Sequence, residues 1–523
     1  MRIQINQIKK QYDDPREPKQ VLLDYFGIKS TEVKDIVLLR ESLDTRRKKN
    51  KPYFIYNFLA TTSDESLLNH KNVSLYKGDT QRQPEPETIN IDKHPIIIGA
   101  GPAGLFAALA LVHKGYKPII YERGKEISQR VKDVKYFLQK RQFNPDSNIA
   151  FGEGGAGTFS DGKLTTRSKS SFAKKVIEIL IENGAPDKIR CQAKPHLGTD
   201  KIRQIVFNTR EYIKKQGGKF HFESFIEEFE VKQGAVSAIY TKGLRVETNS
   251  LILAIGNSAT DTYEALFNSG VSLGQKPYAV GVRVEHPQKF INATQYGPKV
   301  KMELLDAAEY QLTYKCKHSE KGVYSFCMCA GGKIICASSH PQQLVLNGMS
   351  YSSRNLPLGN SAIVVAVNEK DFPSQSPLAA IAFRDEIEKK AFAETPLPYQ
   401  APAQKIADFM DGKITSESIA SSYPLSVFNY DINQLFPDQI VEALKEALLQ
   451  FDRQIKGFIH KGIMLAPETR TSAPVRILRD SESFCSINTK GLYPIGEGSG
   501  YAGGIVSSAV DGLRFAAKVK SLK

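Results

Sequence analysis

The stretch that decides the fold is PIIIGAGPAGLFAALALV at residues 95–112, which carries no charged side chain. Its length is close to the roughly 20 apolar residues that a membrane-spanning helix needs. Three glycines, Gly99, Gly101 and Gly104, interrupt the run with the spacing G-x-G-x-x-G. This spacing predicts a buried strand, a tight turn and a helix instead of a membrane span.

Each glycine has its own mechanical use in such a unit. Gly99 permits the turn, Gly101 lets a pyrophosphate approach the backbone at the helix N-terminus, and Gly104 lets the helix pack on the strand. The unit also needs an acidic residue about 20 positions further on to bind a ribose hydroxyl. Glu122 follows a second strand-like segment at 118–121 and meets this need. The sequence therefore predicts a dinucleotide-binding α/β unit.

Composition limits the class of protein. A chain of 523 residues with 41% hydrophobic content can bury several cores. The N-terminal MRIQINQIKKQYDDP has no apolar region of the kind found in signal peptides, and no other segment approaches spanning length. Six cysteines do not make a disulfide framework, and there is no CxxC. We therefore expect a cytoplasmic protein without a membrane span.

The net charge of +15 is unevenly distributed. Residues 161–220 carry 14 Lys or Arg against 6 Asp or Glu, an excess of 14 − 6 = 8. A solvated basic helix over 199–218 explains much of it. The sharper alternative is a site that attracts an anion, such as the phosphates of a nicotinamide cofactor, an acidic substrate or RNA.

The chain is expected to contain a small N-terminal α+β domain with its linker at 1–90, and a dinucleotide-binding domain at 91–275 that includes a β-meander from about residue 219. An inserted α+β substrate domain would follow at 276–485, with proline at the first position of helices near 377–392 and 437–451. Residues 486–523 would then return to the first domain. The stretches TRRKKNK at 45–51 and QRQPEPET at 81–88 are expected to be a loop and a linker.

A second glycine-rich strand end, LYPIGEGSGYAGGI at 492–505, indicates which dinucleotide is bound. A carboxylate at Glu497 can accept hydrogen bonds from ribityl hydroxyls. A helix beginning near Gly504 and Ile505 presents free N–H groups to the flavin edge that becomes anionic on reduction. The alternative is a purely structural glycine loop that only turns the chain.

Together these motifs resemble the glutathione-reductase-type FAD-binding superfamily, and within it a bacterial family of FAD-dependent dehydrogenases or oxidoreductases of unknown substrate. The resemblance covers nearly the whole chain. It is carried by GAGPAGLFAA, YERG, FGEGGAGTFSDGKLTTR, PHLGTDKIR, LAIGNSATDTY, FCMCAGG, NGMSYSSRN, LAPETRTSAPVRILRD and PIGEGSGYAGGIVSSAVDG. Ala330 stands where the family is expected to have proline.

The resemblance implies a set of cofactor contacts. The pyrophosphate would be lined by Gly99, Gly101, Ala103 and Gly104, with Glu122 on the adenosine ribose and Arg123 beside it. The backbone near Phe225 would meet the adenine, and Gly256 would lie beside the cofactor. Gly157, Thr158 and Ser160 would pass close to the flavin. Glu497, Gly504 and Ile505 would hold the ribityl chain and the flavin.

The motifs that the sequence lacks narrow the range of reactions that we expect. There is no second G-x-G-x-x-G between the meander and the late motif, and no CxxC or CxxxxC near the flavin motifs. Thiol-disulfide reduction of the glutathione reductase kind is therefore disfavoured. One Rossmann unit with a large insert is the arrangement of the hydroxylases, the amine and amino-acid oxidases and the prenyl saturases.

Candidates for catalysis are weaker. A hairpin centred on Gly331 and Gly332 would place Cys327 opposite Cys336, as a redox pair, as metal ligands with Cys316 and His318, or simply as packing residues. We favour packing and expect no metal site. Arg470 is a candidate for an anionic substrate or the flavin. His286 is a further candidate, or only caps a strand.

The sequence thus predicts an α/β protein with a single Rossmann-like FAD-binding domain. Hydride would pass through non-covalently bound FAD to or from a small-molecule substrate, an anionic one included, with NAD(P)H as a transient electron donor or with another protein as the source. The alternative is an RNA-associated flavoprotein similar to tRNA-modifying FAD proteins, although the sequence disfavours nucleic acid as a partner. A third alternative is FAD as a purely structural or sensing ligand.

Overall fold

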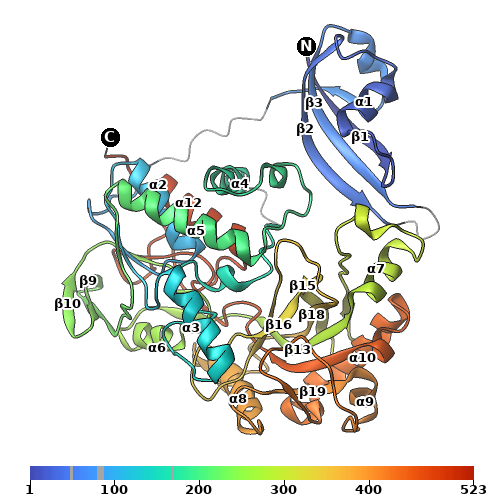
Figure 1. Ribbon diagram of the computed structural model, residues 1–523. Coiled ribbons are helices and arrows are strands. Elements are labelled where there is room, and N and C mark those ends of the chain that lie inside the picture. Colours follow the sequence, from blue (N-terminus) through green and yellow to red (C-terminus); the bar gives the residue numbers. More distant parts are fainter. Residues whose placement is uncertain (47–50, 79–86, 167–169, 523) are drawn as a thin grey trace.

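The computed structural model describes residues 1–46, 51–78, 87–166 and 170–522 of the chain. The stretch at 45–51 and the linker at 81–88 lie largely outside the described residues. Three sheets organise the chain (Figure 1): a small N-terminal sheet, a parallel sheet and a large antiparallel sheet. No helix in these described ranges is long and apolar enough to cross a membrane.

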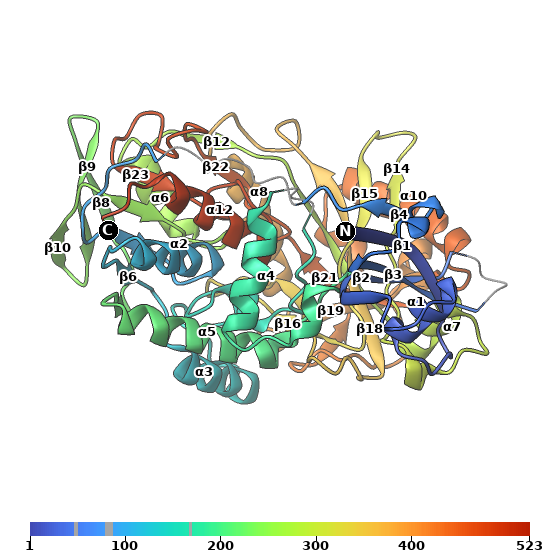
Figure 2. The ribbon, with the colours of Figure 1, turned by 90° about the horizontal axis from the view of Figure 1, so that it is seen from above.

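The N-terminal sheet has the strand order β2-β3-β1-β4 and packs against one helix. Its elements are β1 (Arg2–Gln11), α1 (Pro18–Phe26), β2 (Val33–Asp44), β3 (Tyr53–Thr62), η1 (Glu65–Asn69) and β4 (Val73–Leu75). The edge strand β2 is joined to the rest of the protein by backbone hydrogen bonds. The Glu41 N–H donates to the Cys191 carbonyl over 2.7 Å, and the Ala193 N–H donates to the Glu41 carbonyl over 2.8 Å. Figures 1 and 2 both place this sheet on the side of the molecule that carries α7.

The parallel sheet has the order β23-β11-β5-β6-β7, and all its neighbouring strands are parallel. Its strands are β5 (Ile96–Ile98), β6 (Ile119–Tyr121), β7 (Lys219–His221), β11 (Leu251–Leu253) and β23 (Leu492–Pro494). One core contains α2 (Pro102–His113), α4 (Phe172–Glu182), α5 (Gly198–Lys215) and α12 (Ile505–Lys518). The other helices of this region are α3 (Ile127–Lys140) and α6 (Thr260–Asn268), with η2 (Ala156–Phe159) and η3 (Asp187–Arg190). The apolar stretch at 95–112 is therefore a strand and a helix, as its glycines predict.

The predicted meander is smaller than expected. Only β8 (Glu228–Lys232), β9 (Ala235–Thr241) and β10 (Leu244–Glu247) form it. The segments at 219–221 and 251–253 are strands, as predicted, but they pair in the parallel sheet. Residues 251–253 are buried there between two layers, and Phe220 of the edge strand packs against one of the two cores.

The large sheet has the order β14-β15-β18-β13-β21-β19-β20. Its strands are β13 (Tyr278–Pro287), β14 (Thr313–Lys315), β15 (Gly322–Cys329), β18 (Leu358–Val367), β19 (Ala401–Lys405), β20 (Val427–Asn429) and β21 (Ile463–Glu468). Around it lie α7 (Gln288–Tyr296), η4 (Met302–Leu304), α8 (Ala379–Ala393), α9 (Ile406–Asp411), η5 (Ile432–Leu435), α10 (Asp438–Gln454) and α11 (Phe458–Lys461). Both prolines expected at a first helical position precede their helices. Pro437 is the N-cap of α10, and Pro377 comes before the N-cap Leu378 of α8.

The prediction of a hairpin that pairs Cys327 with Cys336 is wrong. Strand β15 stays in the large sheet between β14 and β18, while β16 (Lys333–Cys336) pairs with β17 (Leu346–Met349). The physical reason is that the chain turns away after Cys329, so the two strands join different sheets. A last pair, β12 (Leu273–Gln275) with β22 (Val475–Ile477), lies where the parallel and large sheets meet. We propose the limits at residues 90, 275 and 485 as the domain boundaries.

Candidate functional site

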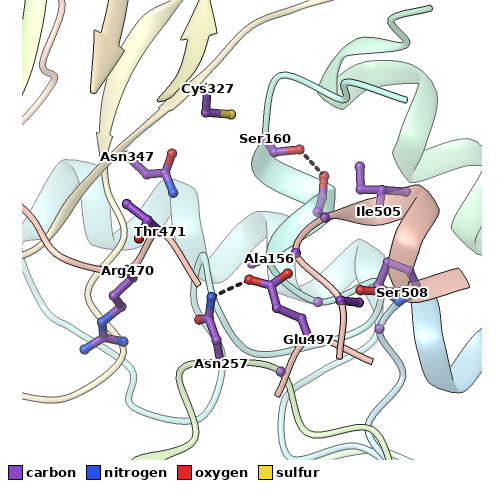
Figure 3. A pocket seen from close by; sticks show the side chains of 18 of the residues that line it. Ala156, Ser160, Asn257, Cys327, Asn347, Arg470, Thr471, Glu497, Ile505 and Ser508 are labelled. Atoms are coloured by element: carbon purple, nitrogen blue, oxygen red, sulfur yellow. Dashed lines mark hydrogen bonds between the residues drawn. The ribbon is translucent and has the colours of Figure 1, made fainter. Parts of the chain in front are cut away.

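A cavity of about 1740 Å³ lies between the carboxyl ends of the parallel strands and the large sheet. Ligand pockets usually measure roughly 300–1,000 Å³, so this cavity has room for a dinucleotide and a second molecule. Its walls come from the β5–α2 turn, the loop before η2, the segment after β11, strand β15 and the loop before α12. Figure 3 shows side chains from several of these segments converging on the same space.

The β5–α2 turn has the shape that its glycines predict. Gly99 has a positive φ of 100°, and a Cβ there would lie 2.3 Å from the Ala254 carbonyl oxygen. A Cβ on Gly104 would lie 2.0 Å from the Gly99 carbonyl oxygen, so helix and strand pack as closely as glycine allows. Gly101 differs, because its Cβ would meet no protein atom nearer than 3.9 Å. Gly101 and Ala103 line the cavity, whereas Gly104 lies behind it.

The charged residues after β6 are held by the protein as well as facing the cavity. The Glu122 carboxylate accepts hydrogen bonds from the backbone N–H groups of Ala100, Gly124 and Gly152 at 2.9–3.0 Å. It thereby ties the glycine turn to the loop before η2. The Arg123 guanidinium lies 4.2 Å from the Phe151 ring centroid and 4.4 Å from that of Phe225, and pairs with carboxylates on its edges.

The loop before η2 is organised by a buried cation that the sequence analysis did not single out. Arg130 on α3 is fully buried, and its guanidinium donates to the backbone carbonyls of Asn148, Ile149, Gly152, Glu153 and Gly155 at 2.7–3.1 Å. Burial lowers the pKa of Arg130 to about 9, so the side chain remains a cation at neutral pH.

The end of this loop supplies two of its three predicted contacts to the cavity. Gly157 and Ser160 line it. Thr158 is fully buried instead, and its hydroxyl donates to the Glu153 carbonyl over 3.2 Å, so its side chain is turned into the protein. The reason is the one-turn helix η2, in which successive residues point to different sides.

The late motif brings a helix terminus and a carboxylate to the cavity. Helix α12 begins at Ile505 with Gly504 as its N-cap, and a Cβ on Gly504 or Gly256 would meet no protein atom within 4 Å. The Glu497 carboxylate accepts a hydrogen bond from the Asn257 amide over 2.6 Å (Figure 3). Its surroundings exclude most solvent, which raises the pKa of Glu497 to about 7 from 4.5.

This raised pKa gives a test on the ligand-free protein. Because ionised Glu497 is disfavoured in the fold, its contribution to the free energy of unfolding falls as pH rises from about 4.5 to about 7. Glu497→Gln removes the ionisation. The free energy of unfolding of the variant should therefore exceed that of wild type by roughly 1–2 kcal/mol above pH 7 and equal it below pH 4.5. Urea unfolding at several pH values measures the difference.

The buried carboxyl of Glu153, whose pKa is also raised to about 7, is present in both proteins and cancels in this comparison. A stability difference that does not change with pH would show that Glu497 does not titrate as described.

Two of the three candidate catalytic residues are already engaged elsewhere. Arg470 touches the cavity wall, but its guanidinium donates to the Glu388 carboxylate at 2.6 and 2.9 Å and to Ser339 and Gln343. His286 lies outside the cavity, where its Nε2 bonds the Phe458 carbonyl at 2.8 Å and burial lowers its pKa to about 4. Neither side chain is placed to bind substrate. Cys327 is the candidate that faces the cavity.

The basic segment at 161–220 is not one continuous binding face. Arg210 forms ion pairs with Glu126, Glu153 and Glu211 at 2.8–3.1 Å. Lys163 lies in the cavity wall, 3.7 Å from Asp161 and 3.5 Å from Glu309. These two cations are therefore paired with carboxylates, whereas Lys194 is exposed at the cavity rim.

The fold and the glycine-lined cavity define a dinucleotide-binding α/β protein, and comparison with known proteins agrees. The profile of the family described as "FAD-dependent protein, C-terminal domain-like" matches residues 277–471, and that of the NAD(P)-binding Rossmann-like domain matches residues 97–153. An uncharacterized protein of Clostridium beijerinckii is 41% identical over 523 residues, which covers 99% of this chain and 98% of that protein.

Solved structures resemble the chain only distantly. A triple mutant of the flavin-dependent brominase Bmp2 is 13% identical with a TM-score of 0.34, covering 82% of this chain and 80% of that one. L-Amino acid deaminase from Proteus myxofaciens in complex with anthranilate is 11% identical with a TM-score of 0.31, covering 84% and 93%. These scores carry no argument about chemistry.

The chain belongs to the bacterial family of FAD-dependent oxidoreductases of unknown substrate, within the glutathione-reductase-type FAD/NAD(P)-binding superfamily.

Proposed function

We propose that the chain binds FAD non-covalently in the cavity and acts as an oxidoreductase on a small molecule. The observation that carries this proposal is the convergence of the N-termini of α2 and α12 on one cavity, at glycines whose missing side chains leave open space. Helix N-termini and exposed backbone N–H groups suit a pyrophosphate and an electron-rich ring edge. The described residues therefore fit the cofactor.

Each part of the cavity has a part of FAD to hold. Gly101 and the first turn of α2 would hold the pyrophosphate, with the backbone at Gly256 beside it. Glu122, Arg123 and Phe225 would lie at the adenosine end. The Glu122 carboxylate has acceptor capacity left for a ribose hydroxyl, since two oxygens offer about four lone-pair sites.

The flavin end would lie against the opposite glycine loop. Glu497 would accept hydrogen bonds from ribityl hydroxyls. Gly504 and Ile505 would direct the positive end of α12 at the ring edge that gains charge, and Gly157 and Ser160 would contact the ring. When bound, FAD supplies hydride transfer at its N5 atom. The helix terminus would stabilise the reduced form and so favour electron uptake.

The substrate would enter from the large sheet. Strand β15 contributes Tyr324 and Phe326 to the cavity wall, and Asn347 and Thr471 add polar groups (Figure 3). A wall that combines apolar side chains with hydrogen-bonding groups suits a small organic substrate. For an anionic substrate, Lys194 at the rim replaces Arg470 as our candidate, since the Arg470 guanidinium is already bound to Glu388. Six free cysteines fit a cytoplasmic location.

The electron donor is tested by anaerobic reduction of the FAD-loaded protein with NADH and NADPH. We propose that either nicotinamide binds only transiently, so the rate at which the flavin band bleaches should rise linearly with its concentration and fall with added salt. Reduction that saturates at micromolar nicotinamide would contradict this and indicate a dedicated nicotinamide site. No bleaching, with a flavin that dithionite still reduces, would indicate reduction by the substrate or by another protein.

A further inference from the structure

Cys327 and Cys329 lie next to each other at an irregular point of β15. The pairing of β15 with β18 shifts register between Phe326 and Cys329, so the bulge gives Cys327 a positive φ of 48°. Bulges of this kind re-aim side chains near functional sites. Here Cys327 faces the cavity, whereas Cys329 is fully buried behind it.

The two cysteines are joined by a hydrogen bond. The Cys329 thiol donates to the Cys327 carbonyl oxygen over 3.5 Å. Arg283 holds both residues, since its Nη2 lies 2.9 Å from that carbonyl oxygen and 3.5 Å from the Cys329 Sγ. The strand thus presents one accessible sulfur with a second one directly behind it.

The surrounding charges favour a thiolate at the accessible position. The neighbouring Cys329 thiol and the cations Lys163 and Arg283 lower the pKa of Cys327, against burial and the carboxylate of Asp161. Lys163 is fixed beside the pair by donating to the carbonyl of Met328, the residue between the two cysteines. The pKa of Cys329 is raised well above its usual value by the neighbouring Cys327 thiol and by burial, so this sulfur stays protonated.

We propose that Cys327 and Cys329 form a redox pair that exchanges two electrons with the bound flavin, an inference that rests on the proposed function. In the oxidising direction an S–S bond forms between them, the S–H bond of Cys329 breaks, and its proton passes with two electrons to the flavin. The thiolate, the thiol and FAD become a disulfide and FADH⁻, so atoms and charge balance. An accessible low-pKa thiol with a second thiol behind it is the arrangement of redox-active cysteines.

The position of Cys327 suits this exchange. In Figure 3 its sulfur points into the space that is bordered by Ser160 and Ile505, two residues of the proposed flavin site. The pair is a CxC, so a search for CxxC or CxxxxC does not find it. The proposed partner of Cys327 is Cys329, two residues further along the chain, in place of the predicted Cys336.

The test is an anaerobic dithionite titration of the FAD-loaded full-length protein after air oxidation. We expect wild type to take up a second electron pair for each flavin, because the disulfide is reduced as well. Cys327→Ser and Cys329→Ser should each take up only one pair, while Cys191→Ser, which changes a distant thiol, should behave like wild type. Peptide mapping of oxidised wild type by mass spectrometry should show Cys327 linked to Cys329.

Uptake of a single electron pair by wild type, with both thiols open to alkylation after oxidation, would overturn the inference while leaving FAD binding intact. A protein that never acquires flavin absorbance would instead contradict the proposed function. The pair is then tested without FAD by oxidised dithiothreitol: an intramolecular Cys327–Cys329 link supports a redox pair, and its absence overturns it. Peptide mapping needs no variant, so misfolding of a serine variant does not decide the result.

Discussion

Replacing Arg130 with methionine is expected to cost at least about 4 kcal/mol of stability and to abolish FAD binding. Arg130 makes five hydrogen bonds to backbone carbonyls of the 148–155 loop, and methionine can make none of them. Hydrogen bonds from a charged donor contribute about 1.5–3 kcal/mol each, and carbonyls left buried without a partner add a further cost. The loop should lose its shape, and with it the cavity wall that contains Gly155 and Gly157.

Arg203→Met is the matched control for this prediction. The guanidinium carbons of Arg130 and Arg203 lie 4.9 and 4.6 Å from the Phe159 ring centroid, but Arg203 is partly exposed and its Nε has no hydrogen-bond partner. It should lose less than about 1 kcal/mol and keep the cofactor. Urea unfolding and flavin absorbance measure both effects. If the two variants behaved alike, the carbonyl network around Arg130 would not be what shapes the loop.

Gly101→Val should weaken FAD binding at least about 100-fold, roughly 2.7 kcal/mol, with little change in the stability of the ligand-free protein. The new side chain would extend into cavity space that no protein atom fills, where the proposed pyrophosphate lies. The φ of Gly101 is −78°, which any residue adopts, so the substitution introduces no backbone strain. Fluorescence titration with FAD measures the dissociation constant.

Gly104→Ala gives the opposite pattern and serves as the comparison. Its Cβ would clash with the Gly99 carbonyl oxygen at 2.0 Å, so the variant should lose about 1–3 kcal/mol of stability in the absence of any cofactor. Wild-type affinity for FAD in Gly101→Val would place the pyrophosphate elsewhere.

The parts of the site that follow from local backbone needs could be predicted from the sequence. The turn at Gly99, the packing at Gly104 and the helix start at Gly504 each depend on a few neighbouring residues. Glu122 was predicted at the end of the second strand, and it is there, although its carboxylate also binds the backbone of two loops.

What the sequence could not predict depends on residues distant along the chain. The Arg470 guanidinium is a group that could bind an anionic ligand, but it is bound by Glu388, 82 residues away along the chain. A local hairpin would pair Cys327 with Cys336, whereas β15 and β16 join different sheets. These pairings are decided by tertiary packing, which no local pattern specifies.

The sequence contains a signal that identifies Arg130 as a buried residue. It lies on the apolar stripe of α3 with Ile127, Val134 and Phe137, at intervals of three and four residues, and all four are buried. A charged residue in the middle of such a stripe must be buried with its hydrogen-bonding groups satisfied, and that requirement marks it as a structural centre.

The central claim, that this cavity holds FAD, is tested most directly by the visible absorption spectrum of the purified protein before and after incubation with FAD and removal of unbound cofactor. We predict a flavin spectrum at one FAD per chain in wild type, lost in Gly101→Val while the variant remains folded. A folded wild-type protein that stays colourless after incubation with FAD would contradict the claim.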